Sequence, residues 1–67
     1  MDRIETPLEL AERRIREGEE RIARQRALIS KLTDQGGHAL LYDAVLFLQA
    51  LEAVQREHVA ILARMRR

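Results

Sequence analysis

Hydrophobic residues recur through both halves of this chain at alternating spacings of three and four, the pattern of one helix face sustained over several heptad repeats. In the first half the series consists of Leu8, Ala11, Ile15, Gly18, Ile22, Gln25, Ile29 and Leu32. In the second half it consists of Leu41, Ala44, Leu48, Leu51, Gln55, His58, Leu62 and Met65. We expect two helices that pack along this seam as in a coiled coil, held by its large apolar members: Leu8, Ile15, Ile22, Ile29, Leu32, Leu41, Leu48, Leu51 and Leu62.

The residues around the two seams mark where each helix begins and ends. Thr6 suits the N-cap of the first helix, a proline follows it, and Glu9 stands where a capping box needs an acid. A glycine pair interrupts the pattern in mid-chain and supplies the left-handed residue that ends a helix. These signals predict helices over about 7–34 and 38–66, with residues 1–5 frayed.

Two helices of equal length joined by so short a loop must run antiparallel. Folding the chain about Gly36 brings seam residues opposite one another: Leu32 with Leu41, Ile22 with Leu51, and Leu8 with Met65. The registers agree from the loop to the chain ends. The expected fold is therefore all-α, a two-helix antiparallel hairpin that forms one domain over residues 1–67.

A second apolar stripe runs along the predicted second helix, next to its seam. It consists of Leu40, Phe47, Val54 and Ile61, each seven residues after the last. The first helix offers mostly Arg and Glu at its flanking positions, so it would leave this stripe uncovered. Burial of each such side chain contributes about 1.5–3 kcal/mol, and soluble monomers avoid exposed patches of this kind. We expect the stripe to be the association face of a homodimer, a four-helix bundle, although a helix of another protein would cover it equally well.

Several polar residues and one glycine interrupt the seam. Gln25, Gln55 and His58 are expected to fix the register of pairing at some cost in stability. Gly18 lies opposite Gln55, which indicates a close approach of the two helices at that point. A metal site at His58 would need further ligands one turn away, and its neighbours Val54, Gln55, Ile61 and Leu62 are poor ones. No metal or cofactor is expected.

The composition excludes several classes of protein. There is no cysteine, hence no disulfide framework or thiolate metal site. The longest apolar run, Ala44–Leu48, is too short to cross a bilayer, and the start of the chain has no apolar signal segment. No phosphate loop, nucleophile with an adjacent base, or cofactor motif is present. We expect a cytoplasmic protein that is not an enzyme.

Charge leaves two alternatives to a protein-binding role. Residues 13–31 hold seven basic and three acidic side chains, so a dimer could bind nucleic acid through Arg13, Arg14, Arg21 and Arg24. The basic residues are, however, interleaved with acids at helical spacing, which predicts pairs that would consume their charge: Glu9–Arg13, Glu12–Arg16, Glu17–Arg21 and Glu20–Arg24. The other alternative is a hairpin lying on a membrane surface, which is disfavoured because basic residues are not expected to flank the stripe.

The segment Glu17–Arg26, followed by Leu28, Ile29 and Leu32, resembles a family of short helical proteins of proteobacterial, mainly alphaproteobacterial, genomes. Its pattern is EGE-R-I-x-RQR-x-LI, then a glycine-containing turn and a leucine-rich second helix. The resemblance spans residues 10–62, is most specific over 17–29, and departs from the family pattern at Ala39-Leu40-Leu41. It implies a bacterial, cytoplasmic setting and adds no activity, since none is assigned to the family.

The sequence therefore favours a non-catalytic protein–protein interaction module, a small regulator or adaptor that self-associates through its second helix. It leaves open the identity of any further partner. It also leaves open whether Gly18, His58 or the arginines at 64–67 have a functional role.

Overall fold

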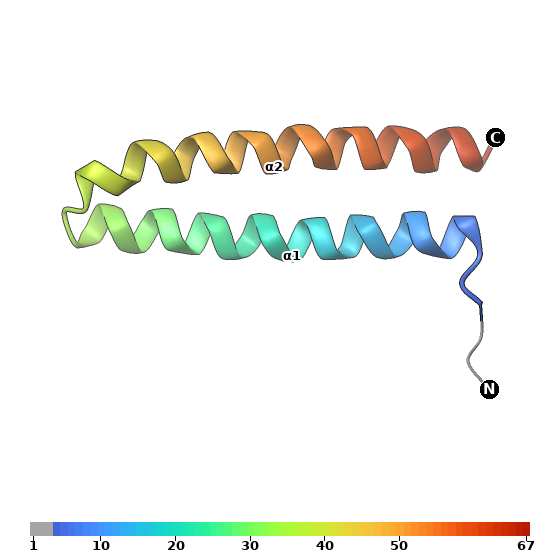
Figure 1. The fold of residues 1–67 in the computed structure, drawn as a ribbon, viewed down its shortest axis with the longest axis horizontal. Coiled ribbons are helices and arrows are strands. Elements are labelled where there is room, and N and C mark those ends of the chain that lie inside the picture. Colours follow the sequence, from blue (N-terminus) through green and yellow to red (C-terminus); the bar gives the residue numbers. More distant parts are fainter. Residues whose placement is uncertain (1–3) are drawn as a thin grey trace.

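The computed structural model describes residues 4–67, which form two helices of 28 residues each, α1 (Pro7–Asp34) and α2 (His38–Met65). The helices lie side by side and antiparallel, with the loop at one end and the start of α1 and the end of α2 at the other (Figure 1). The predicted all-α hairpin is confirmed, and α2 ends one residue earlier than expected. Of the segment expected to fray, residues 1–3 lie outside the described part of the chain.

The start of α1 is the predicted capping box. The backbone N–H of Glu9 donates to Thr6 Oγ1 at 3.1 Å, and the backbone N–H of Thr6 donates to Glu9 Oε1 at 3.0 Å. Pro7 occupies the first turn, where a backbone N–H would have no partner within the helix. These residues satisfy donors that every helix start leaves free.

The loop is a Schellman turn built on the glycine pair. Gly36 has a φ of +72°, a conformation that side chains with a Cβ rarely adopt. The backbone N–H of Gly37 donates to Leu32 O at 2.8 Å, and that of Gly36 donates to Thr33 O at 3.3 Å. The turn satisfies the last carbonyls of α1 and reverses the chain within three residues.

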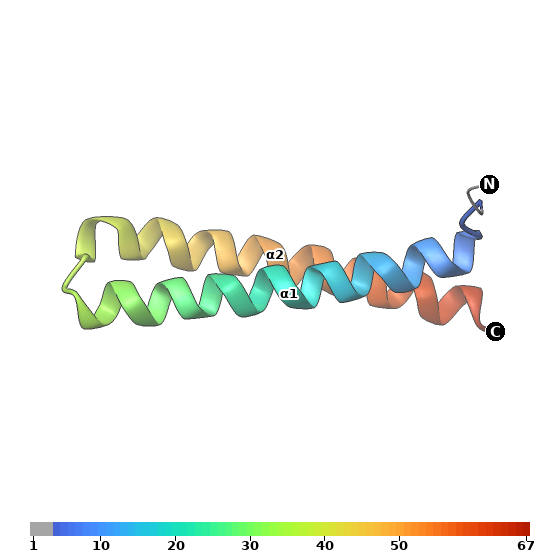
Figure 2. The same cartoon turned by 90° about the horizontal axis from the view of Figure 1, so that it is seen from below.

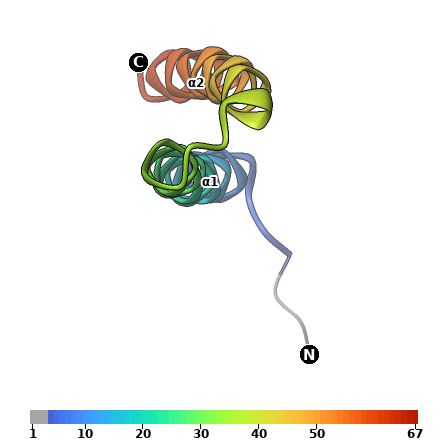
Figure 3. The same cartoon turned by 90° about the vertical axis from the view of Figure 1, so that its left-hand side faces the viewer.

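The two helices cross at a shallow angle along a molecule 47 Å long (Figure 2), and the end view shows no third element over either of them (Figure 3). Because each helix has only one neighbour, few residues are enclosed. Among the described residues, only Gln25, Ala44 and Leu62 are buried. The other seam residues along the middle of the hairpin are half-buried: Ala11, Ile15, Gly18, Ile22, Ile29, Leu32, Leu41, Leu48, Leu51, Gln55 and His58.

Two glutamines join the helices by hydrogen bonds from side chain to backbone. The Gln25 side chain of α1 donates through Nε2 to Ala44 O of α2 at 2.8 Å. The Gln55 side chain of α2 donates through Nε2 to Ile15 O of α1 at 3.0 Å. A slip of either helix by one turn would break both bonds, which supports the predicted role of the two glutamines in setting register.

Gly18 provides room for the second of these bonds. A Cβ added at this position would overlap Gln55 Oε1 and lie 2.8 Å from Gln55 Cδ. The amide therefore rests against the bare backbone of α1, and the close approach expected from the sequence is confirmed.

This contact predicts that Gly18→Ala and Gln55→Ala have non-additive effects on stability. Alanine within a helix is worth about 1 kcal/mol over glycine. In the wild type the new methyl group displaces the Gln55 amide, and loss of that hydrogen bond costs about 0.5–1.5 kcal/mol. Gly18→Ala should therefore stabilise the Gln55→Ala variant by about 1 kcal/mol and the wild type by much less. Urea unfolding of all four proteins at one protein concentration measures the difference, and equal stabilisation in both backgrounds would contradict it.

Candidate interaction surface

Ion pairs between the helices lie along one long side of the hairpin. Arg26 Nη2 of α1 is 3.0 Å from Glu52 Oε2 of α2, and Arg66 Nη2 is 3.0 Å from Glu12 Oε2. Glu12 and Arg26 are two heptads apart, as are Glu52 and Arg66, so both pairs fall on the same side. We call this side the paired face. Its polar contacts link the two helices at the solvent-exposed edge of the seam.

The opposite side carries the predicted apolar stripe of α2, and we call it the open face. All four stripe residues are exposed, with side chains 62%, 56%, 52% and 40% accessible in the order Leu40, Phe47, Val54 and Ile61. None of the described residues buries them. The stripe is therefore a regular apolar surface exposed on the open face.

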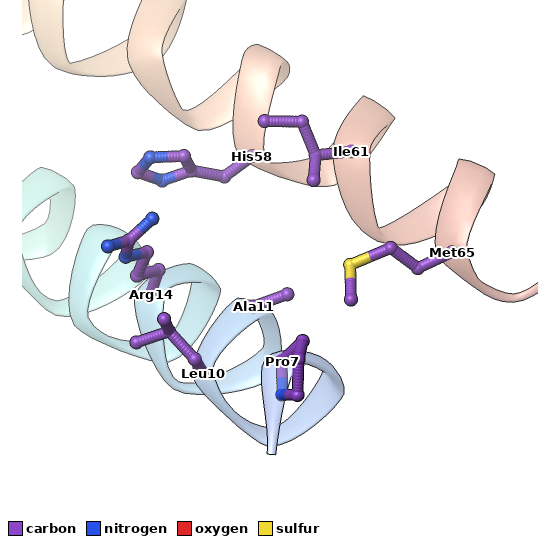
Figure 4. A pocket seen from close by; sticks show the side chains of 7 residues that line it. All are labelled: Pro7, Leu10, Ala11, Arg14, His58, Ile61 and Met65. Carbon is purple, nitrogen blue, oxygen red and sulfur yellow. The ribbon is translucent and has the colours of Figure 1, made fainter. Parts of the chain in front are cut away.

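Two hollows on the open face show which α1 residues border the stripe. One, about 180 Å³ in volume, is formed where side chains from the two ends of the chain face one another (Figure 4). Its lining residues are Pro7, Leu10, Ala11 and Arg14 of α1 with His58, Ile61 and Met65 of α2. The other is lined by Arg21, Arg24, Gln25 and Leu28 of α1 with Phe47 and Leu51 of α2. The α1 edge thus consists of a leucine near each end with arginines between them.

The expectation that no basic residues flank the stripe is wrong, and the α1 edge contains residues that the sequence analysis did not place on this surface. Basic residues do flank the stripe, although from α1 rather than from α2. Arg14, Arg21 and Leu28 each directly precede a seam residue, at seven-residue spacing. That spacing is the signal that could have placed them next to the stripe. It could also have identified Leu28, which is 44% exposed, as part of the same surface.

The seam opens near the chain ends. Leu8 and Met65, expected to pack on one another, are 40% and 41% exposed. Met65 borders the hollow of Figure 4 together with Pro7. No third helix covers this end of the hairpin, so the last seam residues are only partly enclosed. The sequence pattern alone does not show this opening.

His58 is half-buried on the seam, as expected for a polar seam residue. Its Nδ1 atom has no hydrogen-bond partner within the described residues, so His58, unlike the two glutamines, joins the helices by no hydrogen bond through this atom. Across residues 4–67, no three His, Cys, Asp or Glu side chains gather in a way that could hold a metal ion. Within the same residues, neither helix is long and apolar enough to cross a membrane.

Apolar exposure on α2 extends beyond the predicted stripe. Tyr42, Leu46 and Val59 are also exposed and lie off the line of seven-residue spacing. They were missed because they follow no period of their own. Leu46 has an accessibility of 46% and neighbours Phe47 in the chain, so it offers a matched position outside the open face.

The ion pairs of α1 differ from those predicted. Arg13 pairs with Glu5 at 2.9 Å and with Glu17 at 2.5 Å, and Glu17 also lies 3.6 Å from Arg21, which confirms the predicted Glu17–Arg21 pair. Glu12 reaches across to α2 instead of pairing with Arg16. The predicted pair between Glu20 and Arg24 does not form among the described residues. Glu5, which precedes α1, and Arg66, which follows α2, pair with Arg13 and Glu12 and so compete with partners one helical turn away.

The contact with Arg13 lowers the pKa of both carboxyl groups that it joins. Hydrogen bonding from the guanidinium is the main cause for Glu5 and for Glu17, and the positive charge of Arg13 adds to it. The same bonds raise the pKa of Arg13. By contrast, Arg14 and Arg24 take part in no ion pair in the described part of the chain, so the α1 edge of the open face keeps uncompensated positive charge.

These shifts predict a pH-dependent contribution of Arg13 to stability. A carboxyl group whose folded pKa is lowered stabilises the fold above its ordinary pKa of 4.5, and this effect is lost as pH falls through the folded pKa. Arg13→Gln should therefore raise the pKa of Glu17 and of Glu5, measured by carbon-13 NMR titration of the carboxyl groups. The difference in thermal stability between wild type and variant should shrink on acidification. Unchanged titration of both groups in the variant would contradict the contact.

No family model, curated protein or solved structure matches this chain. The family resemblance over residues 10–62 stays a prediction.

Proposed function

We propose that this protein is a non-catalytic interaction module that associates with itself through the open face, giving a four-helix bundle from two hairpins. The observation that carries the proposal is the stripe of Leu40, Phe47, Val54 and Ile61, which remains exposed after the hairpin has formed. A regulator or adaptor of this kind acts by presenting a helical surface to another polypeptide.

The energetics of the hairpin support association. Two helices bury only a narrow strip, and chains of this size are close to the lower limit for a stable core. A standard interface covers about 800 Å² on each partner, roughly one seventh of the 5420 Å² that this chain exposes. Covering the stripe adds apolar burial that a single hairpin lacks. Folding and association are therefore expected to be coupled.

The charge distribution disfavours the nucleic-acid alternative. Of the four arginines that it requires, Arg13 already holds two carboxylates and Arg21 lies near Glu17. Phosphate binding would have to displace these acids, because affinity for nucleic acid depends on uncompensated cations.

A membrane-surface hairpin is the second candidate, because arginines border the apolar stripe. A helix that lies in a bilayer interface combines such an apolar arc with basic residues at its edge. Co-sedimentation with vesicles containing anionic lipid would support this alternative if it is lost in Phe47→Asp. Failure of the wild type to bind the vesicles at low salt would remove it.

The proposal predicts a dimer that one substitution in the stripe dissociates. Sedimentation equilibrium of the wild type at micromolar concentration should give the mass of two chains, and the melting temperature should rise with protein concentration. Phe47→Asp should yield monomer, folded or unfolded as judged by circular dichroism, because burial of an unpaired charge costs several kcal/mol.

Leu46→Asp is the matched control for this experiment. It introduces the same charge at the neighbouring residue, outside the open face, and should remain dimeric. A wild-type monomer whose melting temperature is independent of concentration would refute self-association. Equal dissociation by Leu46→Asp and Phe47→Asp would show that the faces are assigned wrongly.

A further inference from the structure

Apart from Glu17 on α1 and Arg64 on α2, the two edges of the open face carry opposite charges. Arg14, Arg24 and Lys31 lie along the α1 edge, whereas Asp43 and Glu57 lie along the outer edge of α2. Each of these acids is three residues after a stripe residue. The seam residues, which face α1, follow each stripe residue by one and by four, on one side of the stripe. A residue three positions later lies on the other side, away from α1. Within the described residues, none of these five side chains takes part in an ion pair. A partner of matching charge can therefore pair with them.

The contact between the helices sets the height of each charge along the hairpin. Gly18 is level with Gln55. Arg14 is four residues before Gly18, so it is level with residue 59 of the antiparallel α2. Glu57 is two residues from that level, which at a rise of 1.5 Å per residue is about 3 Å along the axis. By the same count Lys31 is level with residue 42, about 1.5 Å from Asp43. The basic and acidic edges are thus matched in height.

A second copy can pack on the open face in two symmetric ways. If the two-fold axis runs along the hairpin, both loops lie at the same end and every residue keeps its height. Phe47 then packs on the partner's Phe47, and the α1 edge of one copy lies against the acidic edge of the other. Arg14 meets the partner's Glu57 and Lys31 meets the partner's Asp43. Symmetry repeats each contact, so four ion pairs border the apolar centre.

If the axis runs across the hairpin instead, the loops lie at opposite ends. The stripe still matches itself, with Phe47 against the partner's Val54. Asp43 is then level with the partner's residue 58, next to the partner's Glu57. On the other edge, Arg21 is level with the partner's Arg24. Both edges bring like charges together, which is costly at an interface.

We infer that two copies of this chain associate with their loops at the same end, with the α2 helices parallel at the centre and Arg14 of each copy facing the partner's Glu57. This inference rests on the proposed self-association and adds its direction and the residues that fix it. The apolar stripe can be buried in both arrangements, so the charged contacts at the edges determine which of the two is more stable. A single acid, Glu17, falls near the partner's Glu57, and Arg13 and Arg21 already compensate it.

Distances between spin labels test the direction. The chain has no cysteine, so Gln35→Cys in the loop and Arg64→Cys near the chain end each give one labelling site. In the inferred dimer, labels at Gln35 should be within about 25 Å of one another, since neighbouring helices are roughly 10 Å apart. Labels at Arg64 should be equally close. A mixed dimer labelled once at each site should show a separation near the 47 Å length of the hairpin.

The opposite pattern, with the mixed pair close and the like pairs far apart, would overturn the inference while leaving self-association intact. A wild-type monomer in sedimentation would remove both. A monomer that binds a synthetic acidic amphipathic helix on the open face would likewise overturn the inference, because the basic edge would then serve a different partner.

Charge reversal tests the residues. Arg14→Glu and Glu57→Arg should each weaken dimerisation about tenfold, and the double variant should recover most of the loss because the pair is restored with its signs exchanged. Arg16→Glu is the control for charge reversal on α1, because Arg16 is exposed and borders neither hollow. It should change the dissociation constant by much less. Additive losses in the double variant would contradict the Arg14–Glu57 contact.

Discussion

A pair of helices shares only one line of contact, and this constraint governs the whole molecule. Each helix can bury one strip of side chains against the other, and all remaining surface faces solvent unless another chain covers it. The sequence of α1 suits that limit better, because most of its large apolar residues lie in the seam, with Leu10 and Leu28 as exceptions, and charged residues occupy most other positions. The sequence of α2 exceeds it, with apolar residues on the seam, on the stripe and at Tyr42, Leu46 and Val59. The stripe is the part of this excess on which the proposed association rests.

Hydrogen bonds give the seam a specificity that leucine and isoleucine packing would not supply. Apolar packing with a seven-residue repeat does not by itself distinguish registers one heptad apart, whereas Gln25 and Gln55 each have one acceptor on the other helix. The two bonds run in opposite directions and lie in different parts of the hairpin. Together with Gly18, which admits the Gln55 amide, they make a single register favourable.

Most of the fold could be predicted from the sequence because its determinants are local. The capping box, the glycine turn and the heptad spacing each depend on residues close together in the chain, and the structure has all three. The register followed from counting outward from the turn. The ion pairs could not be predicted in the same way, because Glu12 reaches Arg66 and Arg13 reaches Glu5, and such partners depend on side-chain geometry rather than spacing.

The candidate surface was predictable only in part for a similar reason. The stripe has a period and could be recognised from it, whereas the edge of α1 becomes part of the surface through the way in which the helices face one another. The way in which α1 is rotated about its own axis against α2 makes Leu10, Leu28 and the arginines between them part of this surface. Likewise the opening of the seam at Leu8 and Met65 depends on where the second helix ends and on the absence of a covering element there.

The tight turn also governs how the chain folds. Because only three residues separate the helices, closing the loop costs little chain entropy, and the first contacts between α1 and α2 are those nearest to Gly36. Later contacts can then form in order of sequence separation, and this low contact order favours rapid pairing of the two helices. The order reverses on opening, when the half-exposed end at Leu8 and Met65 separates first. Amide hydrogens should accordingly exchange most readily at the end of the hairpin that holds Leu8 and Met65, and most slowly in the part of the seam next to the turn.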